Sequence, residues 1–135
     1  MALKKSNVLV VGAGGLGCPI LLYLAAAGIG KLGVVDFDII DIENLHRQIL
    51  YDETDVGKFK AIVACEKIKK LHPYVNIEVF NKAIDYENVT SIISNYDVIV
   101  DGSDNFATRY LLNDACVIMD KPYIYVAVFK YEGQV

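Results

Sequence analysis

The chain has 135 residues and a formal net charge of −4, and 54% of its residues are hydrophobic. That length and hydrophobic share suit a compact domain with a buried core and exclude a disordered chain. A mildly acidic chain also lacks the basic surface by which proteins bind nucleic acid, so we expect no nucleic-acid partner.

The cysteines and one uncharged stretch indicate the compartment. Cys18, Cys65 and Cys116 lie far apart and form no C-x-x-C pair, which favours free thiols in a reducing environment. The uncharged stretch runs from Ser6 to Gly30. Glycines in its middle favour a strand, a turn and a helix over a membrane span. We therefore expect a cytoplasmic protein with no membrane partner.

Buried strands alternate with helices along the chain. Short apolar runs predict strands over 7–11, 32–35, 76–80, 97–100 and 123–128. Helix-forming residues and apolar stripes predict helices over 18–27, 57–71, 86–94 and 105–119. Between the second strand and the second helix, residues 37–54 form a long loop of the kind that is usually functional in a small domain.

This alternation predicts the fold class α/β, as a Rossmann-like, doubly wound and mainly parallel sheet. The third strand alternates polar and apolar residues, which favours a position near a sheet edge. Residues 133–135 follow a polar turn and have the character of the start of another strand. We therefore expect the sheet to be truncated at its C-terminal end.

A glycine-rich turn joins the first strand to the first helix. Gly12, Gly14 and Gly17 satisfy G-x-G-x-x-G, in which the glycines permit a tight turn, close approach of a pyrophosphate and helix–strand packing. The N-terminus of the following helix offers free N–H groups to phosphate. Asp36 ends the second strand, where a carboxylate can accept hydrogen bonds from ribose hydroxyls. This set fits NAD as well as ATP.

Polar residues in three later segments favour ATP. The long loop contains Asn44, Arg47 and Gln48, Lys58 and Lys60 lie at the start of the next helix, and Asp104 follows the fourth strand. Because the C-terminal ends of parallel strands share one edge, these residues should converge on the glycine turn. A triphosphate requires cations and a hard metal ion with oxygen ligands, whereas a dinucleotide oxidoreductase requires neither.

Each of these residues also has a purely structural interpretation. Asp104 or Asn105 could cap the helix that begins there. Arg47 could be a solvated loop charge. Lys58 and Lys60 could both face the solvent, and for Lys58 we prefer that interpretation. Only the combination indicates a nucleotide site.

Seven segments also match a known family in that family's order. They are VVGAGGLG (10–17), VDFD (35–38), NLHRQ (44–48), VGKFKA (56–61), VDGSDN (100–105), TRYLLNDAC (108–116) and EGQV (132–135). Together they make the chain resemble the ThiF/MoeB/HesA superfamily, which includes the ubiquitin-activating enzymes. The resemblance implies ATP-dependent adenylation of the C-terminal glycine carboxylate of a small ubiquitin-like or sulfur-carrier protein, with release of pyrophosphate. Residues 1–135 would then be a single, partial ATP-binding adenylation domain.

The resemblance also implies a role for each matching residue. The implied nucleotide-binding residues are Gly12, Gly14, Gly15 and Gly17 around the nucleotide, Asp36 at the ribose, Asn44, Arg47 and Lys60 at the phosphates, and Gln48 in support of the loop. Asp104 would hold Mg²⁺. Arg47, Lys60 and Asp104 would be the catalytic residues. No general base is needed because the nucleophile is already a carboxylate, so catalysis would depend on positioning and charge stabilisation.

The chain departs from the family at both ends. Members usually have an arginine-containing arm before the first strand, and they continue past Val135 with further sheet, zinc-binding cysteine pairs or a catalytic cysteine. Zinc is therefore expected only in a part beyond Val135, and the chain alone could be inactive. A homodimer is the expected assembly. The alternatives are an NAD-dependent oxidoreductase, which leaves Arg47, Lys60 and Asp104 unexplained, and an inactive nucleotide-binding partner subunit.

Overall fold

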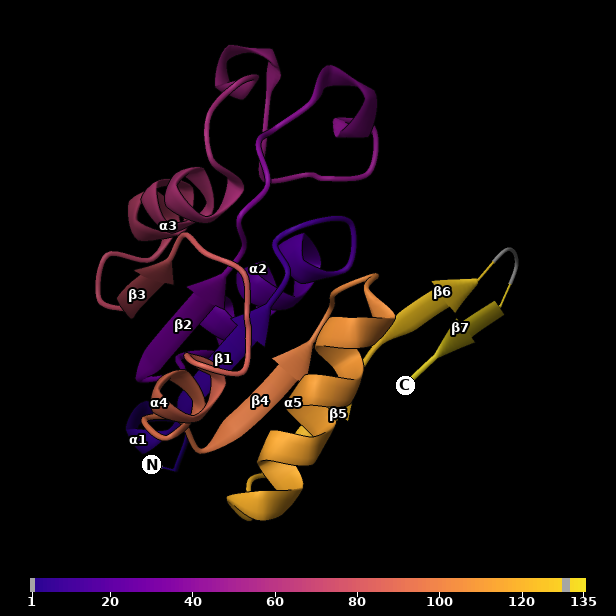
Figure 1. Cartoon of the computed structure of the whole chain (residues 1–135). Coiled ribbons are helices and arrows are strands. Elements are labelled where there is room, and N and C mark those ends of the chain that lie inside the picture. Colours follow the sequence, from indigo (N-terminus) through magenta and orange to yellow (C-terminus); the bar gives the residue numbers. More distant parts are fainter. Residues whose placement is uncertain (1, 130–131) are drawn as a thin grey trace.

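A five-stranded parallel sheet forms the centre of the computed structural model, which describes residues 2–129 and 132–135 (Figure 1). Its order is β3-β2-β1-β4-β5, and every neighbouring pair is parallel. The strands are β1 (Asn7–Val11), β2 (Lys31–Val35), β3 (Asn76–Phe80), β4 (Val98–Asp101) and β5 (Tyr123–Tyr125). The Rossmann-like α/β fold class is thereby confirmed, as is the position of the third strand at a sheet edge.

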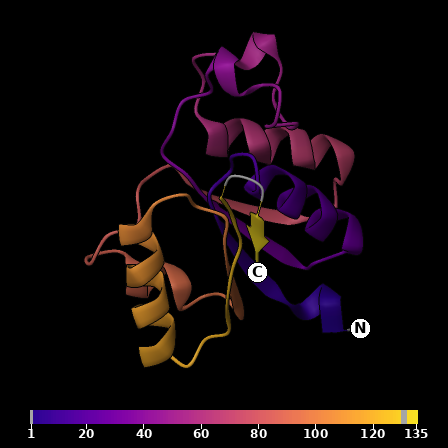
Figure 2. The same cartoon turned by 90° about the vertical axis from the view of Figure 1, so that its right-hand side faces the viewer.

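Helices cover both faces of the sheet. They are α1 (Ala2–Lys5), α2 (Gly17–Ala27), α3 (Lys60–Leu71), α4 (Val89–Ile93) and α5 (Phe106–Ile118), with short 3-10 helices η1 (Ile42–Asn44) and η2 (Glu53–Asp55). Figure 2 shows α2 and α3 on one side of the sheet and α4 and α5 on the other. β1 contributes to the core on both faces of the sheet, because successive side chains of a strand point to opposite faces. Val10 lies in the α2–α3 core, and Leu9 lies in the α4–α5 core.

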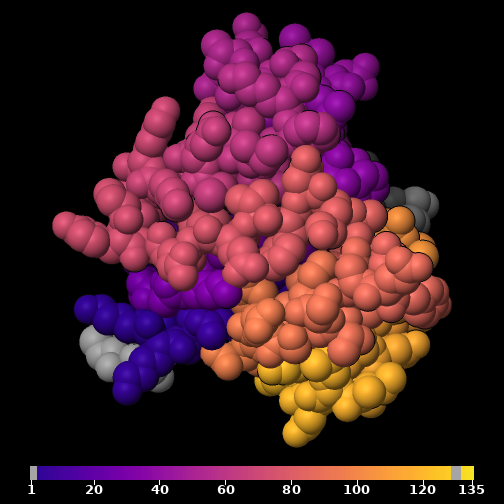
Figure 3. Space-filling view, turned by 60° about the vertical axis from the view of Figure 1, so that its left-hand side comes forward, coloured from indigo at the N-terminus to yellow at the C-terminus, as the bar shows by residue number. Residues whose placement is uncertain are grey.

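The segment between β2 and α3 is closed at its base. Ile40 N–H donates to the carbonyl oxygen of Lys58 over 2.8 Å, and Gly57 N–H donates to that of Ile40 over 2.9 Å. Gly57 lies in a turn with a positive φ of 87°, and Phe59 is still extended. For this reason α3 begins at Lys60 rather than at residue 57. In Figure 3 residues 37–59, in purple to magenta, project at one end of the molecule.

The strand predicted over 123–128 is divided in two. β5 ends at Tyr125, and β6 (Ala127–Phe129) leaves the sheet and pairs antiparallel with β7 (Glu132–Gln134). The expected strand near the C-terminus is therefore present, but it belongs to a hairpin that projects from the body in Figure 1. The α1 turn was not predicted, and α4 is shorter than the predicted helix over 86–94.

Within residues 2–129 and 132–135, none of the helices has the length and apolar character that crossing a bilayer would require.

Candidate functional site

A cavity of about 900 Å³ opens at the C-terminal ends of the central strands, a size typical of small-molecule sites. The glycine turn, the end of β2, residues 44–48, the start of α3 and the β4–α5 loop line it. The expected site residues in its lining are Gly12, Gly14, Gly15, Asp36, Asn44, Arg47, Gln48, Lys60 and Asp104. The structure thus brings together residues from five separate segments of the chain, while their individual roles stay predictions.

The glycine turn is shaped by two close backbone approaches. A Cβ atom at Gly12, whose φ is +96°, would lie 3.0 Å from the carbonyl carbon and oxygen of Gly102. A Cβ atom at Gly17 would lie 1.8 Å from the carbonyl oxygen of Gly12, so only glycine fits there. Gly17 is buried beneath the turn and is not part of the cavity lining. Its position serves helix–strand packing, whereas Gly14 and Gly15 face the cavity.

Free backbone donors line this turn. Among the described residues, the N–H groups of Gly14 and Gly15 donate no hydrogen bond, and Leu16 at the start of α2 gives no side-chain cap. Unsatisfied N–H groups at a helix N-terminus favour a bound anion. The turn therefore has the chemistry of a phosphate site.

Asp36 is held in place by two backbone donors. Ala13 N–H donates to its Oδ2 and Asp38 N–H to its Oδ1, each over 2.7 Å. Burial raises the pKa of this carboxyl, and the two N–H groups oppose that rise. Because each carboxylate oxygen has a second lone pair, Asp36 can still accept hydrogen bonds from a ligand.

Residues 44–48 place a cation and an amide over the glycine turn. Arg47 Nη2 donates to Asn44 Oδ1 over 3.1 Å, and its side chain lies close to Gly15. Gln48 is buried, and its Oε1 has no hydrogen-bond partner among the described residues. A Cβ atom at Gly14 would lie 3.6 Å from the Nε2 of Gln48. The unpaired oxygen of Gln48 indicates that water or a ligand completes the site, while its role in support of the turn stays a prediction.

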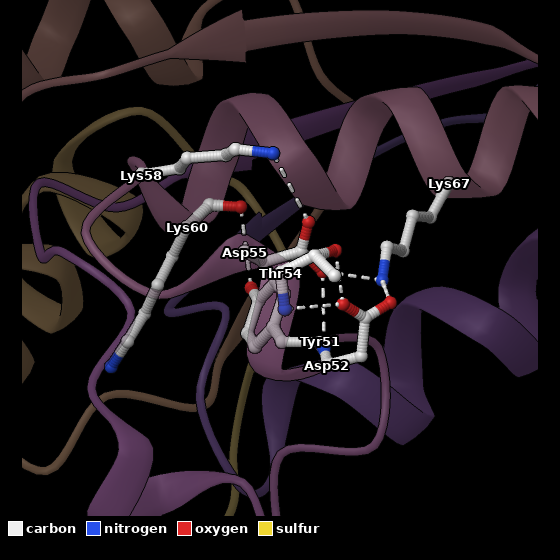
Figure 4. Close-up of polar contacts among 7 residues, drawn as sticks. All are labelled: Tyr51, Asp52, Thr54, Asp55, Lys58, Lys60 and Lys67. Carbon is white, nitrogen blue, oxygen red and sulfur yellow. Dashed lines mark hydrogen bonds and ion pairs between the residues drawn. The ribbon is translucent and has the colours of Figure 1, made fainter.

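Lys60 is a buried cation that pairs with one carboxylate and interacts electrostatically with a second, that of Asp36. It is 5% exposed, its Nζ lies 3.7 Å from Asp38 Oδ2, and its backbone N–H donates to the Asp38 carbonyl oxygen over 3.0 Å. A buried ammonium is costly without compensation, so an anionic ligand would complete its surroundings. Figure 4 shows its side chain extending away from Lys58, whose Nζ instead lies 3.6 Å from Asp55 Oδ1. Lys58 does not line the cavity, as expected of a solvent-facing residue.

A cluster of Asp52, Asp55 and Lys67, which the sequence analysis missed, attaches the segment between β2 and α3 to the side of α3. Lys67 Nζ donates to Asp52 Oδ2 over 2.8 Å and also pairs with Asp55 (Figure 4). Hydrogen bonds from Lys67 and Thr54 lower the pKa of Asp52 to about 2. The signal in the sequence was a pair of acidic residues three positions apart, Asp52 and Asp55. These two side chains form a capping box at η2.

Asp101 shapes the β4–α5 loop. Its carboxylate is fully buried and accepts hydrogen bonds from Ser103 N–H (2.9 Å), Ser103 Oγ (2.6 Å) and Tyr123 OH (2.6 Å). Arg109 lies 3.8 Å from it and donates to the Ser103 carbonyl oxygen over 2.9 Å. The sequence analysis missed Arg109 and Tyr123. A buried aspartate at a strand end requires donors, but finding them required the β4–β5 pairing.

Asp104 and Asn105 separate into two roles. Asn105 Oδ1 accepts the Thr108 N–H over 3.2 Å and caps α5. Asp104 is exposed at the cavity wall, and its side chain makes no hydrogen bond or ion pair with any described residue. Since Asn105 is the cap, the Asp104 carboxylate is available to a metal ion. The described residues contain no cluster of three or more metal-ligating side chains, so phosphate and water oxygens would supply the other ligands.

Matches to known proteins extend over nearly the whole chain. A family model for the ThiF family matches residues 1–135. The chain is 53% identical over 133 residues to a probable molybdopterin-synthase adenylyltransferase of Porphyra purpurea, and 50% identical to a sulfur carrier protein adenylyltransferase of Thermus thermophilus. These matches cover 98% of this chain but only 35% and 49% of those relatives, so the chain spans half of their length or less.

A solved structure with the same fold contains a nucleotide. The E. coli tRNA N6-threonylcarbamoyladenosine dehydratase TcdA, in complex with ATP, superposes with a TM-score of 0.88 at 28% identity. The match covers 92% of this chain and 51% of that one.

Proposed function

The chain belongs to the ThiF family, and from this we propose that it is the nucleotide-binding part of an adenylyltransferase. The proposed reaction is ATP-dependent adenylation of the C-terminal glycine carboxylate of a ubiquitin-like or sulfur-carrier protein. One observation carries the proposal: a glycine turn, the carboxylate of Asp36, the cations Arg47 and Lys60 and the unpaired carboxylate of Asp104 line a single cavity. The adenylyltransferase names of its relatives support it.

The nucleotide would lie across the ends of β1, β2 and β4. Asp36 would accept hydrogen bonds from the ribose, and the free N–H groups of Gly14 and Gly15 would donate to phosphate oxygens. Arg47 and Lys60 would approach the phosphates from two different segments of the cavity lining. Asn44, which accepts from Arg47, would orient that guanidinium.

The chemistry requires little beyond placement and charge. An oxygen of the carrier's carboxylate attacks the α-phosphorus of ATP, the bond from that phosphorus to the bridging oxygen breaks, and pyrophosphate leaves with the electron pair. No proton moves, so no general base is required. Arg47 and Lys60 would stabilise the charge that develops on the phosphates, which costs no reorganisation if both are already in position.

Mg²⁺ would bind at Asp104, with the phosphates and water as its other ligands. When bound, it would offset negative charge on the triphosphate. The unpaired state of the Asp104 carboxylate supports this assignment.

We further propose a small carrier protein as substrate partner, a homodimeric assembly and a cytoplasmic location. Three free cysteines agree with a reducing compartment. An NAD-dependent oxidoreductase would share the glycine turn and Asp36, but it would leave Arg47 and Lys60 without a task.

The test is ATP–pyrophosphate exchange by the complete protein that contains this chain. Radiolabelled pyrophosphate should enter ATP only when a carrier protein with a free C-terminal glycine is added. The matched control is the same carrier with its terminal carboxylate amidated, which should give no exchange. If no free-carboxylate carrier from the sulfur-transfer or ubiquitin-like classes supports exchange, or if the protein binds NAD and not ATP, the proposal is wrong.

A further inference from the structure

The hydroxyl of Tyr51 is buried and lies against two segments that line the cavity, the glycine turn and the start of α3. Tyr51 itself belongs to the segment between β2 and α3, which also contributes to the lining. Tyr51 is 5% exposed, and its OH donates to the carbonyl oxygen of Ala13 in the glycine turn over 2.7 Å. The same hydroxyl lies 3.2 Å from the carbonyl oxygen of Lys60 at the start of α3 (Figure 4). Its own backbone N–H donates to the Gln48 carbonyl oxygen over 3.1 Å. Nothing in the proposed reaction uses this hydroxyl directly.

The bond to Ala13 controls the direction of a phosphate donor. In a planar trans peptide the carbonyl and the following N–H point in opposite directions. With the Ala13 carbonyl turned inward to the buried hydroxyl, the Gly14 N–H is directed outward, and Gly14 lines the cavity. That N–H donates to no described residue. The other partner of the Ala13 carbonyl is the Cys18 thiol at 3.4 Å, which is a weak donor.

The hydroxyl is suited to remain a donor. Burial raises the pKa of Tyr51 well above its ordinary value, so the phenol keeps its proton throughout the physiological range. The ring lies in the α2–α3 core with Ala61 and Ala64, which restricts its movement.

We infer that Tyr51 is a positioning residue for phosphate binding: its hydroxyl orients the Ala13–Gly14 peptide and holds the start of α3, and with it Lys60, against the glycine turn. The inference rests on the proposed ATP binding and adds to it a residue that touches no nucleotide. It requires that loss of the hydroxyl affects phosphate recognition more than recognition of the nucleoside.

The test is Tyr51→Phe, which removes one oxygen atom and keeps the buried ring. Titration calorimetry of the complete protein should show ATP binding weakened by roughly three- to tenfold, the range expected from one hydrogen bond. Adenosine affinity should be unchanged, because Asp36 stays in place. Equal ATP affinity in the variant and the unaltered protein overturns the inference, and so does an equal loss for ATP and adenosine.

Two controls separate positioning from general loss of stability. Tyr23→Phe removes a hydroxyl from a ring that is 77% exposed on α2, and it should leave both affinities unchanged. Ile93→Val trims a fully buried side chain in the α4–α5 core, so it should lower the melting temperature without a selective loss of ATP affinity. A selective ATP loss in Ile93→Val equal to that in Tyr51→Phe overturns the inference.

A measurement on the unaltered protein gives a second, independent test. The Gly14 amide resonance should shift when ATP is added and stay in place when adenosine is added. If ATP binds and this resonance does not move, the inference fails while the proposed function stands. If ATP does not bind at all, both fail.

Discussion

Asp104→Asn should abolish most of the adenylation activity without loss of stability. The structure separates these two effects because Asn105, and not Asp104, caps α5. The Asp104 side chain is exposed and has no described partner, so its replacement should change the free energy of unfolding by no more than about 0.5 kcal/mol. Loss of one preorganised electrostatic partner typically lowers a rate by about 10²–10³-fold, or roughly 3–4 kcal/mol. Carrier-dependent ATP–pyrophosphate exchange measures the rate, and urea unfolding measures the stability.

Asn105→Ala is the matched variant for this prediction. It removes the hydrogen bond to Thr108 N–H and should cost about 1 kcal/mol of stability, while exchange continues at temperatures where the protein is folded. Asp104→Asn should therefore lower the exchange rate and leave the stability nearly unchanged, whereas Asn105→Ala should lower the stability and leave exchange nearly unchanged. If Asp104→Asn exchanges pyrophosphate at the unaltered rate over a Mg²⁺ titration, the assignment of the metal to Asp104 is wrong.

Three further predictions concern the glycine turn, the buried cation and the acidic cluster. Gly17→Ala should prevent folding, since the new Cβ would lie 1.8 Å from the Gly12 carbonyl oxygen; a cooperative thermal transition at the original temperature would contradict this. Lys60→Met keeps the buried volume and should weaken ATP binding by about 10- to 100-fold in calorimetry, while NAD shows no binding to either protein. The hydrogen bond from Lys67 is the main reason that the pKa of Asp52 is lowered to about 2, and Lys67→Met removes that bond. A carboxyl group whose pKa is lower in the folded than in the unfolded chain stabilises the fold above about pH 4, and this stabilisation is lost as the pH falls toward 2. Urea unfolding should thus show a smaller loss of stability over that window in the variant, and equal losses would refute the role of Lys67.

Local pattern was sufficient to predict the sheet, the glycine turn and part of the cavity lining, but it did not indicate that residues 82–84 and the β6–β7 hairpin also contribute to that lining. The valine runs of β1 and β2 are buried on both faces, and the C-terminal ends of parallel strands must share an edge, so Asp36 and Asp104 could be placed near the turn from sequence alone. The capping question at Asp104 and Asn105 could not be decided, because either side chain can accept a backbone N–H and only the path of the loop selects one.

The residues that the sequence analysis missed are those whose roles depend on distant partners. Tyr51 meets Ala13 across 38 positions, and Tyr123 meets Asp101 across 22. The hydrophobic periodicity of a sequence does not indicate contacts between residues this far apart along the chain. The late start of α3 also follows from the hydrogen bonds of Ile40 with residues 57 and 58, which hold this stretch outside the helix.

The paired base of the 37–59 segment has a consequence for how this segment can change in evolution. Because residues 40, 57 and 58 are hydrogen-bonded across the base, the two ends stay together whatever the length of chain between them. Loop-closure entropy grows only slowly with length, so residues inserted between Glu53 and Thr54, at the exposed tip, should disrupt the capping box of η2 but leave the sheet in place. Insertions between Asn44 and Tyr51 would instead shift Arg47 and Gln48 relative to the glycine turn. Length variation among homologous chains should therefore concentrate at the tip, and the spacing from Asn44 to Tyr51 should stay constant.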